Sequence, residues 1–469
     1  MAHSYLRLLR ILLLLGVFGT GCSFAPDYVR PTMDLPPAWS DTGTEALNVR
    51  WWKRFQDDIL NRLIEEALLN NRDIQQALAR IDFARAQLGL ARADLFPTPG
   101  ATGSAGRSRA SLLSYPPGQP GAETNSNHTA DLGAAWEIDL WGRFRNLDAA
   151  AAARLLAAES TREAVRLGVA GQTTKGYFLL RAFDLQESIA RNTLKTREES
   201  LRIYSARYKR GTVDELDLLR VKAEVEVARS AMYTLRVGRD ASESALAVLL
   251  GRSPQAILTE GAIKRGLALE KMPTAPIFPS GLPSDLLERR PDIRAAEDVL
   301  IAANYNIGAA RAAFFPSVSL TGLLGYASSE LDNLFRTDAR TWQFGGALYL
   351  PLDFWRIQSN LRGTEAQQRE AIAGYQKTVE NAFREIRDAL NEEKQYTKVV
   401  RSLESMAADL RKSVKLVKIR YDNGYSTYLE VLDAERSLFT VEMDLVAARN
   451  RLLNGLVNVC LAIGGGWKE

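Results

Sequence analysis

The clearest pattern of hydrophobic and polar positions is a period-two alternation in short runs of the chain. In residues 131–140, apolar side chains such as Trp136 alternate with small or acidic ones. Residues 317–326 and 341–352 repeat the alternation, whereas the run after Phe96 is weaker because Ala, Gly, Ser and Thr fill it. Each run has about ten residues, the length of a tilted membrane strand. The pattern predicts four strands with one face toward lipid, although a soluble sandwich would alternate in the same way.

Two long regions have the composition and spacing of helices. Residues 121–253 and all residues after Pro351 lack proline and are rich in Ala, Leu, Arg, Glu and Lys. Residues 145–209 contain no strong stop signal, so as one helix they would extend roughly 95 Å. Because the heptads are imperfect, we expect these helices to pack side by side in a curved layer rather than as a two-stranded coiled coil.

The chain also repeats itself. The segment Asn71–Pro97 returns as Arg290–Pro316 with a constant shift of 219 residues, and Tyr208–Leu219 returns as Tyr421–Leu432 with a shift of 213. Two copies are too few for a solenoid, which needs several neighbouring units. The pattern therefore predicts a duplicated half-protein, each half with a helix, two strands and long helices.

Four strands are too few to close a barrel. Unpaired backbone groups on an open edge would face hydrocarbon at a cost of several kcal/mol each, so other copies of the chain must complete the ring. Three copies supply twelve strands, and cyclic symmetry is the common way to close such an assembly. The strand pattern therefore predicts a homotrimer.

The amino terminus has the features of an export signal. Arg7 and Arg10 precede an apolar run at residues 11–18, which is too short to span a bilayer. Cys22 follows, and the segment resembles a bacterial lipoprotein signal, in which such a cysteine becomes the lipidated first residue. Gly19 departs from the usual leucine, so an ordinary cleaved signal remains the alternative.

The residue types needed for catalysis or metal binding are sparse. The two histidines are His3, in the signal, and His128, in a polar loop, so no Cys/His metal cluster can form. No phosphate loop, serine elbow or paired catalytic carboxylate motif is present. Removing residues 1–21 takes away two arginines and no acid, which lowers the net charge from +4 to +2 and gives no case for nucleic-acid binding. We expect neither an enzyme nor a cofactor, against the alternative of a secreted hydrolase.

Several motifs in order resemble one known family over nearly the whole chain. They include Cys22–Pro31, Glu288–Ile293, Tyr421–Gly424, Val431–Arg436 and Gly464–Trp467. These segments are similar to those of TolC-type outer-membrane efflux proteins, in the NodT branch of lipoproteins. The resemblance implies a mixed α+β membrane protein: a trimeric 12-stranded outer-membrane β-barrel, with four strands per chain, continued by a long α-helical periplasmic barrel.

The same resemblance implies a function as the exit duct of a tripartite efflux pump in the outer membrane of a Gram-negative bacterium. The duct would conduct drugs or other small toxic compounds passively. Its partners would be a periplasmic adaptor protein and an inner-membrane pump of the resistance-nodulation-division type, besides outer-membrane lipid. Copper or silver efflux and type I protein secretion use similar ducts and remain alternatives. A trimeric adhesin would instead place its barrel strands at the carboxyl terminus.

The resemblance and the repeat together divide the chain into ten segments. These are a signal peptide (1–21), a lipidated N-terminal segment with part of an equatorial belt (22–56), a first-repeat helix (57–95), a first β-hairpin (96–142), first-repeat long helices (143–250), an equatorial linker (251–284), a second-repeat helix (285–314), a second β-hairpin (315–355), second-repeat long helices (356–463) and a tail (464–469).

The resemblance places a periplasmic gate at the helix that follows Gly424. Leu429, Asp433 and Arg436 match residues that constrict such tunnels, and their spacing puts them on one helix face. Threefold symmetry would turn them into stacked rings, in which an apolar ring can seal and a carboxylate ring sets ion preference. The alternative is an ordinary surface ion pair at a helix start.

Two further groups of residues complete the expected site. By resemblance, Tyr421, Asp217 and Glu430 tie neighbouring helices together near the gate. Three aspartates that converge on one axis would repel, so we expect Arg436, or Arg220 at the equivalent of Asp433 in the first repeat, to offset their charge. The strand alternation turns three carboxylates toward the predicted lumen, where charge stays hydrated. These are Glu137, Asp139 and Asp353.

Overall fold

The structure is a computed structural model that describes residues 23–37, 50–109, 111, 124–259, 263–275 and 283–465. Cys22, the predicted lipidation site, lies outside the described residues. The chain divides into two compact units, which we describe separately. Unit 1 draws on Met1–Thr32, Arg80–Glu159 and Ala295–Tyr375, and unit 2 on Met33–Ala79, Ser160–Arg294 and Gln376–Glu469.

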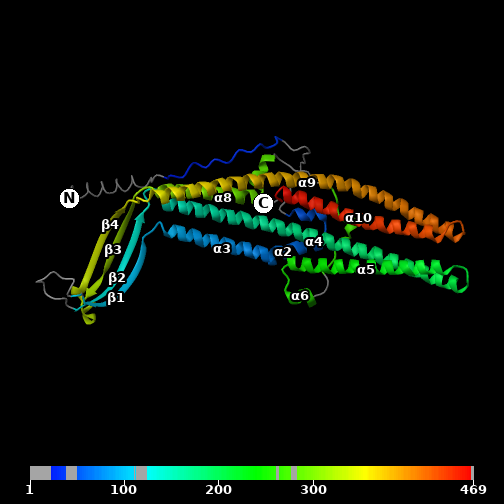
Figure 1. Ribbon diagram of the computed structural model, residues 1–469, viewed down its shortest axis with the longest axis horizontal. Coiled ribbons are helices and arrows are strands. Elements are labelled where there is room, and N and C mark those ends of the chain that lie inside the picture. Colours follow the sequence, from blue (N-terminus) through cyan, green and yellow to red (C-terminus); the bar gives the residue numbers. More distant parts are fainter. Residues whose placement is uncertain are drawn as a thin grey trace. The chain divides into compact units, whose positions relative to one another are not determined.

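Helices make up most of the described chain (Figure 1). In chain order the helical elements are η1 (Trp51–Phe55), α2 (Asp58–Asn70), α3 (Arg72–Ala93), α4 (Arg143–Lys209), α5 (Glu215–Leu249), α6 (Pro254–Thr259), η3 (Leu269–Lys271), η4 (Pro283–Asp285), α7 (Leu286–Arg289), α8 (Pro291–Ala312), η5 (Leu331–Asn333), η6 (Thr337–Ala339), α9 (Phe354–Asp422) and α10 (Tyr428–Ala462). Within the described part of the chain, no helix is both long enough and apolar enough to span a bilayer.

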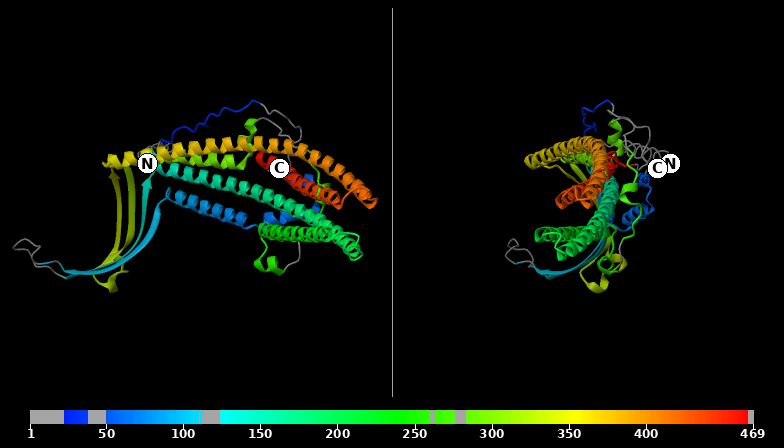
Figure 2. Two further views of the ribbon diagram at one scale, coloured as in Figure 1. Left: turned by 45° about the vertical axis from the view of Figure 1, so that its right-hand side comes forward. Right: turned by 90° about the vertical axis from the view of Figure 1, so that its right-hand side faces the viewer.

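The described residues of unit 1 form one antiparallel sheet of four strands in the order β1-β2-β3-β4. The strands are β1 (Thr98–Arg109), β2 (Thr124–Ile138), β3 (Ser317–Ser328) and β4 (Arg340–Tyr349). The pairing of β2 with β3 joins the two halves of the duplicated chain, while β1 and β4 are the edge strands. Figure 2 shows the four strands as one continuous, curved sheet.

The register gathers the apolar positions of three strands on one face of the sheet. Trp136 lies opposite Leu320, and Leu324 lies opposite Trp342. The side chain of Trp342 is 73% exposed and that of Leu324 57% exposed. The other face carries mostly small and polar residues, with Thr321 opposite Gly345, and includes Leu323 and Tyr349. A contiguous exposed apolar face of this kind marks a surface that meets lipid or protein rather than water.

An extended N-terminal segment is fixed to the helices of unit 1. Arg30 donates from Nε and Nη2 to the carboxylate of Glu297, at 2.7 and 2.9 Å, in a bidentate ion pair. Tyr28 donates its hydroxyl to the same carboxylate at 2.9 Å. Earlier in the same segment, the ring of Phe24 stacks on Phe315 with centroids 4.6 Å apart. Paired charges and stacked rings therefore hold residues 23–32 in one path along α8.

The core of unit 2 surrounds the middle of α4. Phe55 of η1 meets Phe178 of α4 edge to face, with ring centroids 4.9 Å apart. Asp57 is 1% exposed, and its carboxylate accepts hydrogen bonds from the Tyr177 hydroxyl and the Leu267 backbone amide, each at 2.8 Å. Because a buried carboxylate needs such donors, this cluster fixes the segment that follows α6 against α4.

The structure departs from the sequence-based elements at four points. The helix expected over residues 57–95 is broken at Asn71, whose backbone is extended (φ −60°, ψ 135°). The helix expected over residues 285–314 is broken in the same way at Arg290 (φ −77°, ψ 122°). The second strand ends at Ile138, so Asp139 lies beyond it. The helix that begins the second long region starts at Phe354, before the expected boundary at residue 356. Residues 145–209 do form one uninterrupted helix, within α4.

Candidate functional site

Two helical hairpins, α4–α5 and α9–α10, carry the predicted gate residues (Figure 1). Each hairpin turns at a glycine with positive φ, Gly211 at 70° and Gly424 at 77°. The amide of Thr212 donates to the Arg207 carbonyl, and the amide of Tyr425 donates to the Arg420 carbonyl, so the two turns share one hydrogen-bond pattern. A left-handed residue after a helix is most easily glycine. The sequence repeat is therefore also a structural one at the turns.

The predicted gate residues lie in the first turns of α10 and are accessible in the single chain. Leu429 is 48% exposed, and the side chain of Asp433 is 64% exposed. Arg436 lies 3.9 Å from Asp433, at the limit of an ion pair, and makes a closer ion pair with Glu224 of α5. The arginine predicted to offset Asp433 therefore binds mainly across to the other hairpin. The role of these residues as a gate stays a prediction.

A buried ion pair beneath Arg436 was missed by the sequence analysis. Arg197 of α4 pairs with Glu224 of α5, and both side chains are about 95% buried. Burial, against weaker contributions from Glu435 and Tyr428, lowers the pKa of Arg197 from its ordinary value. The signal in the sequence is the position of Glu224, which shares the apolar face of Val221, Val225 and Ala228. A charge on an apolar helix face requires a buried partner.

Tyr421 of α9 contacts the other hairpin within the single chain, and its role in tethering a gate stays a prediction. Its hydroxyl accepts a hydrogen bond from Arg207 Nη1 at 2.7 Å and shares another with the Tyr204 hydroxyl of α4. Tyr428 packs against Tyr204 with centroids 4.5 Å apart. Burial, followed by the hydrogen bond to Tyr421, raises the pKa of Tyr204 well above its ordinary value, so the phenol stays protonated and can donate. An aromatic cluster thus joins α4, α9 and α10.

The other three residues expected near the gate make contacts within their own helices in the single chain. Arg220 lies 3.6 Å from Asp217, three residues earlier on α5. Glu430 forms a capping box with Thr427 at the start of α10. Such contacts stabilise helix ends and add little across helices. A role for Asp217, Arg220 and Glu430 in tying neighbouring helices together stays a prediction.

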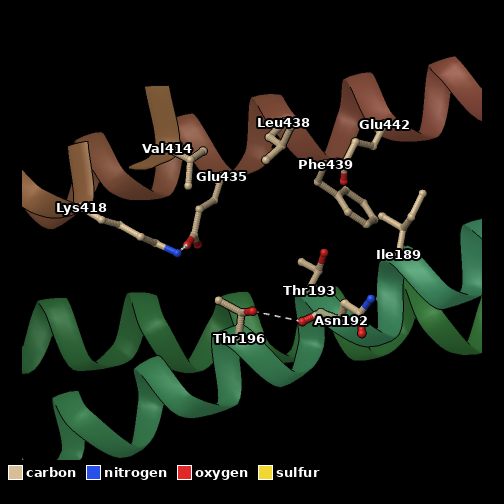
Figure 3. Close-up of a pocket in the computed structure, with 10 residues that line it drawn as sticks. All are labelled: Ile189, Asn192, Thr193, Thr196, Val414, Lys418, Glu435, Leu438, Phe439 and Glu442. Carbon is tan, nitrogen blue, oxygen red and sulfur yellow. Dashed lines mark hydrogen bonds and ion pairs between the residues drawn. The ribbon is translucent and has the colours of Figure 1, made fainter. Parts of the chain in front are cut away.

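A groove with a cavity of about 300 Å³ lies between α4, α9 and α10, beside the ion pairs described above. Figure 3 shows Lys418 of α9 reaching toward Glu435 of α10, and their charged atoms are 2.6 Å apart. Thr196 lines the opposite wall, on α4. The wall residues include both charged and apolar side chains. The lining residues are Ile189, Asn192, Thr193, Thr196, Val414, Lys418, Glu435, Leu438, Phe439 and Glu442.

The three carboxylates expected in the lumen lie at the strand–helix junctions of unit 1 and each has an arginine partner. Glu137 lies 2.8 Å from Arg143. Asp139 accepts the backbone amide of Arg145 at 2.9 Å, and Asp353 accepts that of Arg356 at 3.1 Å. Asp139 and Asp353 therefore cap the starts of α4 and α9. Placing them on a strand face was wrong, because both follow the strand ends; whether they face a lumen stays a prediction.

Comparisons with known proteins agree with this geometry. The family described as outer membrane efflux protein matches residues 63–252 and 282–465. The solvent efflux pump outer membrane protein SrpC of Pseudomonas putida is 35% identical, over 97% of both chains. The outer membrane protein OprJ of Pseudomonas aeruginosa is 36% identical, over 96% of this chain and 94% of its own. The solved structure of the Campylobacter jejuni CmeC outer membrane channel superposes with a TM-score of 0.89 at 28% identity, covering 95% of each chain.

These matches confirm the predicted family, its mixed helix-and-strand channel fold and its location in the outer membrane of Gram-negative bacteria. They span both halves of the duplicated chain, including the hairpins and the sheet. Both the sheet with its exposed apolar face and the paired helical hairpins fit a channel component of an efflux pump. The chain belongs to the outer membrane efflux protein family.

Proposed function

We propose that this protein is the exit duct of a tripartite efflux pump and that three copies build one duct. The observation that carries the proposal is the sheet of unit 1. It has an exposed apolar face and two edge strands, β1 and β4, and four strands cannot close a ring. Three copies would pair each β1 with the β4 of a neighbour and close a ring of twelve strands.

The helices of unit 2 carry a second set of exposed apolar side chains that fits the same assembly. On α5, Val227 is 59% exposed, Val237 70% and Val248 62%. A neighbouring copy that packs along α5 would cover these valines and gain apolar contact from each of them. The purified protein in mild detergent is therefore expected to have the mass of three chains. A closed monomeric barrel would contradict this assembly.

The proposed cargo is small, apolar or amphiphilic toxic compounds. Three relatives from Pseudomonas putida are named as outer membrane proteins of a solvent, a toluene and an antibiotic efflux pump. A passive duct needs no catalytic group, metal or cofactor of its own. The energy would come from an inner-membrane pump. Lipid on Cys22 would add a membrane anchor, since each buried methylene contributes about 0.8 kcal/mol. Cys22→Ala should abolish incorporation of labelled palmitate.

A periplasmic adaptor would dock along the groove between α4, α9 and α10. Lys418 and Glu435 present opposite charges there, and a helical partner with complementary charges would bind in one orientation. The test is accumulation of a fluorescent apolar dye in cells that lack other efflux ducts and that carry adaptor, pump and this protein. Wild-type protein should lower accumulation, and Lys418→Glu should lose the effect while still assembling in the outer membrane.

The predicted gate is tested independently of the adaptor. Asp433 is exposed and makes one long ion pair, so Asp433→Ala should leave the assembly stable. Loss of three converging carboxylates should raise single-channel conductance in planar bilayers. A correctly assembled Asp433→Ala channel with unaltered conductance would show that Asp433 is a surface residue.

A further inference from the structure

In both halves of the chain, a side chain at the same repeat position donates a hydrogen bond to the last carbonyl of the helical hairpin, at the end away from the turn. We call this contact the joint at the base of the hairpin. In the first half, the side-chain amide of Asn71 donates to the carbonyl of Leu249, the last residue of α5, at 2.9 Å. In the second half, Arg290 Nη1 donates to the carbonyl of Ala462, the last residue of α10, at 2.9 Å. The shifts of 219 and 213 residues that relate the two halves carry Asn71 onto Arg290 and Leu249 onto Ala462.

The backbone around the two joints is also the same. The amides of Asn71 and Arg290 donate to the carbonyls four residues earlier, at 2.9 and 3.0 Å, and both residues are extended. After each hairpin a glycine takes positive φ, Gly251 at 72° and Gly464 at 90°. A Cβ on Gly251 would lie 2.2 Å from the Asn70 carbonyl oxygen, and one on Gly464 would lie 3.2 Å from the carbonyl oxygen of the equivalent Arg289. The two joints therefore share hydrogen bonds and backbone conformation, differ in how closely the two segments approach, and differ most in side-chain chemistry.

The chemical difference is charge. Arg290 is 7% exposed, and its guanidinium also pairs with Asp292 of α8 at 2.6 Å and with Glu385 of α9 at 2.8 Å. The position equivalent to Glu385 in the first half is Gln172, by the same shift of 213 residues. The first joint thus uses the neutral side-chain amide of Asn71, and the second a buried arginine that connects α8, α9 and α10.

The charged joint lies on the hairpin that carries the predicted gate. Helix carbonyls at a C-terminus bear partial negative charge, and a buried guanidinium binds them more strongly than an amide does. Arg290 therefore fixes the end of α10 against α9 at the base of the hairpin, whereas Leu429 and Asp433 lie at its tip. A small rotation of α10 at its base becomes a larger displacement at its other end, because the helix has 35 residues.

We propose that Arg290 is a positioning residue for the gate: its charged joint holds the α9–α10 hairpin in the resting position, while the neutral joint at Asn71 serves stability alone. The proposal rests on the proposed function as a gated duct. The joint acts on the gate through α10 and touches no cargo.

The test converts the charged joint into the neutral one. Arg290→Asn with Glu385→Gln installs the residues that the first half already uses, so the fold has a precedent for them. The double variant should assemble normally, and in planar bilayers its ratio of open to closed time should rise about twofold to fivefold, the range expected for a partly exposed ion pair. Asn71→Ala is the matched control, which should lower the melting temperature and leave gating unchanged.

Two outcomes would overturn the proposal: unaltered gating in the assembled double variant, or an equal change in the Asn71→Ala channel. Arg290→Lys adds a second check, because a lysine keeps the charge but loses the fork that reaches both Glu385 and the Ala462 carbonyl. It should give an intermediate open time. A wild-type protein that forms no channel would instead refute the proposed function, so the two failures are distinguishable.

Discussion

At the scale of single residues, the stability of the helical hairpins depends on buried charged side chains. Arg197 and Glu224 are buried against each other, and Arg436 reaches the same carboxylate from α10. Removing one partner of a buried pair leaves the other charge without compensation, which costs more than the pair itself contributes. Arg220 and Asp217, a few residues away on the surface of α5, form the exposed counterpart.

We predict that Glu224→Ala lowers the stability of the helical region by about 3–5 kcal/mol, because Arg197 stays buried and unpaired. Arg220→Ala, on an exposed pair, should cost about 0–1 kcal/mol. Thermal unfolding followed by circular dichroism of the detergent-solubilised protein measures both. Equal melting temperatures for the two variants would show that the Arg197–Glu224 pair is well solvated.

A second residue-scale prediction concerns pH and Glu393 of α9, which is 6% exposed. Burial raises the pKa of Glu393 above its ordinary value near 4.5, against a hydrogen bond from Thr397 and the charge of Lys394. As pH rises through that ordinary value, the unfolded chain releases this proton before the folded one does, so the contribution of Glu393 to stability falls.

Glu393→Gln should therefore raise the melting temperature at about pH 7.5 and leave it unchanged at about pH 4. Glu392→Gln is the control, because Glu392 accepts a hydrogen bond from Asn458 at 3.1 Å that glutamine can also accept. A Glu393→Gln protein that is less stable than wild type at the higher pH would mean that the carboxylate is ionised and satisfied in the fold.

Sequence reasoning at this scale found the residues that local spacing reveals. Leu429, Asp433 and Arg436 could be placed on one helix start because a glycine turn and a cap precede them. The partner of Arg436 could not be found, since its contact with Glu224 depends on how α10 packs on α5. That packing joins residues about 210 positions apart, where no local rule applies.

At the scale of elements, alternation was sufficient to predict the strands and their shared apolar face, because a period of two fixes which side chains point together. The ends were not predictable to the residue. The capping carboxylates Asp139 and Asp353 continue the alternation in sequence and yet belong to the helices that follow. The break at Asn71 was missed for a related reason, since an asparagine in a polar helical stretch gives no strong stop signal by itself.

The face assignment makes a prediction within a single strand. Leu324 and Thr321 lie on opposite faces of β3, and the first belongs to the apolar face. Leu324→Arg should cost about 2–4 kcal/mol or block insertion, since it would place a charge against lipid, whereas Thr321→Arg should be tolerated. Heat-resistant oligomer on gels of outer-membrane fractions measures the difference. Equal tolerance of the two substitutions would contradict a lipid-facing side.

At the scale of the whole molecule, the duplication explains why one chain supplies two similar hairpins and two strand pairs. The sequence alone predicted that several copies must close the ring, because four strands leave edges. It could not predict that the two joints at the hairpin bases differ in charge, since this requires knowing which carbonyl each side chain reaches.

The sheet order has a genetic consequence. Because β1 and β4 are the edges and differ in character, every contact in a ring is head to tail, and each copy must offer two sound edges. A chain with a defective β1 would still present a normal β4, so it could join a ring with normal chains. That ring would then have one strand pair that does not form. With equal amounts of mutant and normal chains, only about one ring in eight would be wholly normal. Edge mutations should therefore be dominant over the wild-type gene in cells that express both, as measured by dye accumulation, whereas mutations that prevent folding altogether should be recessive.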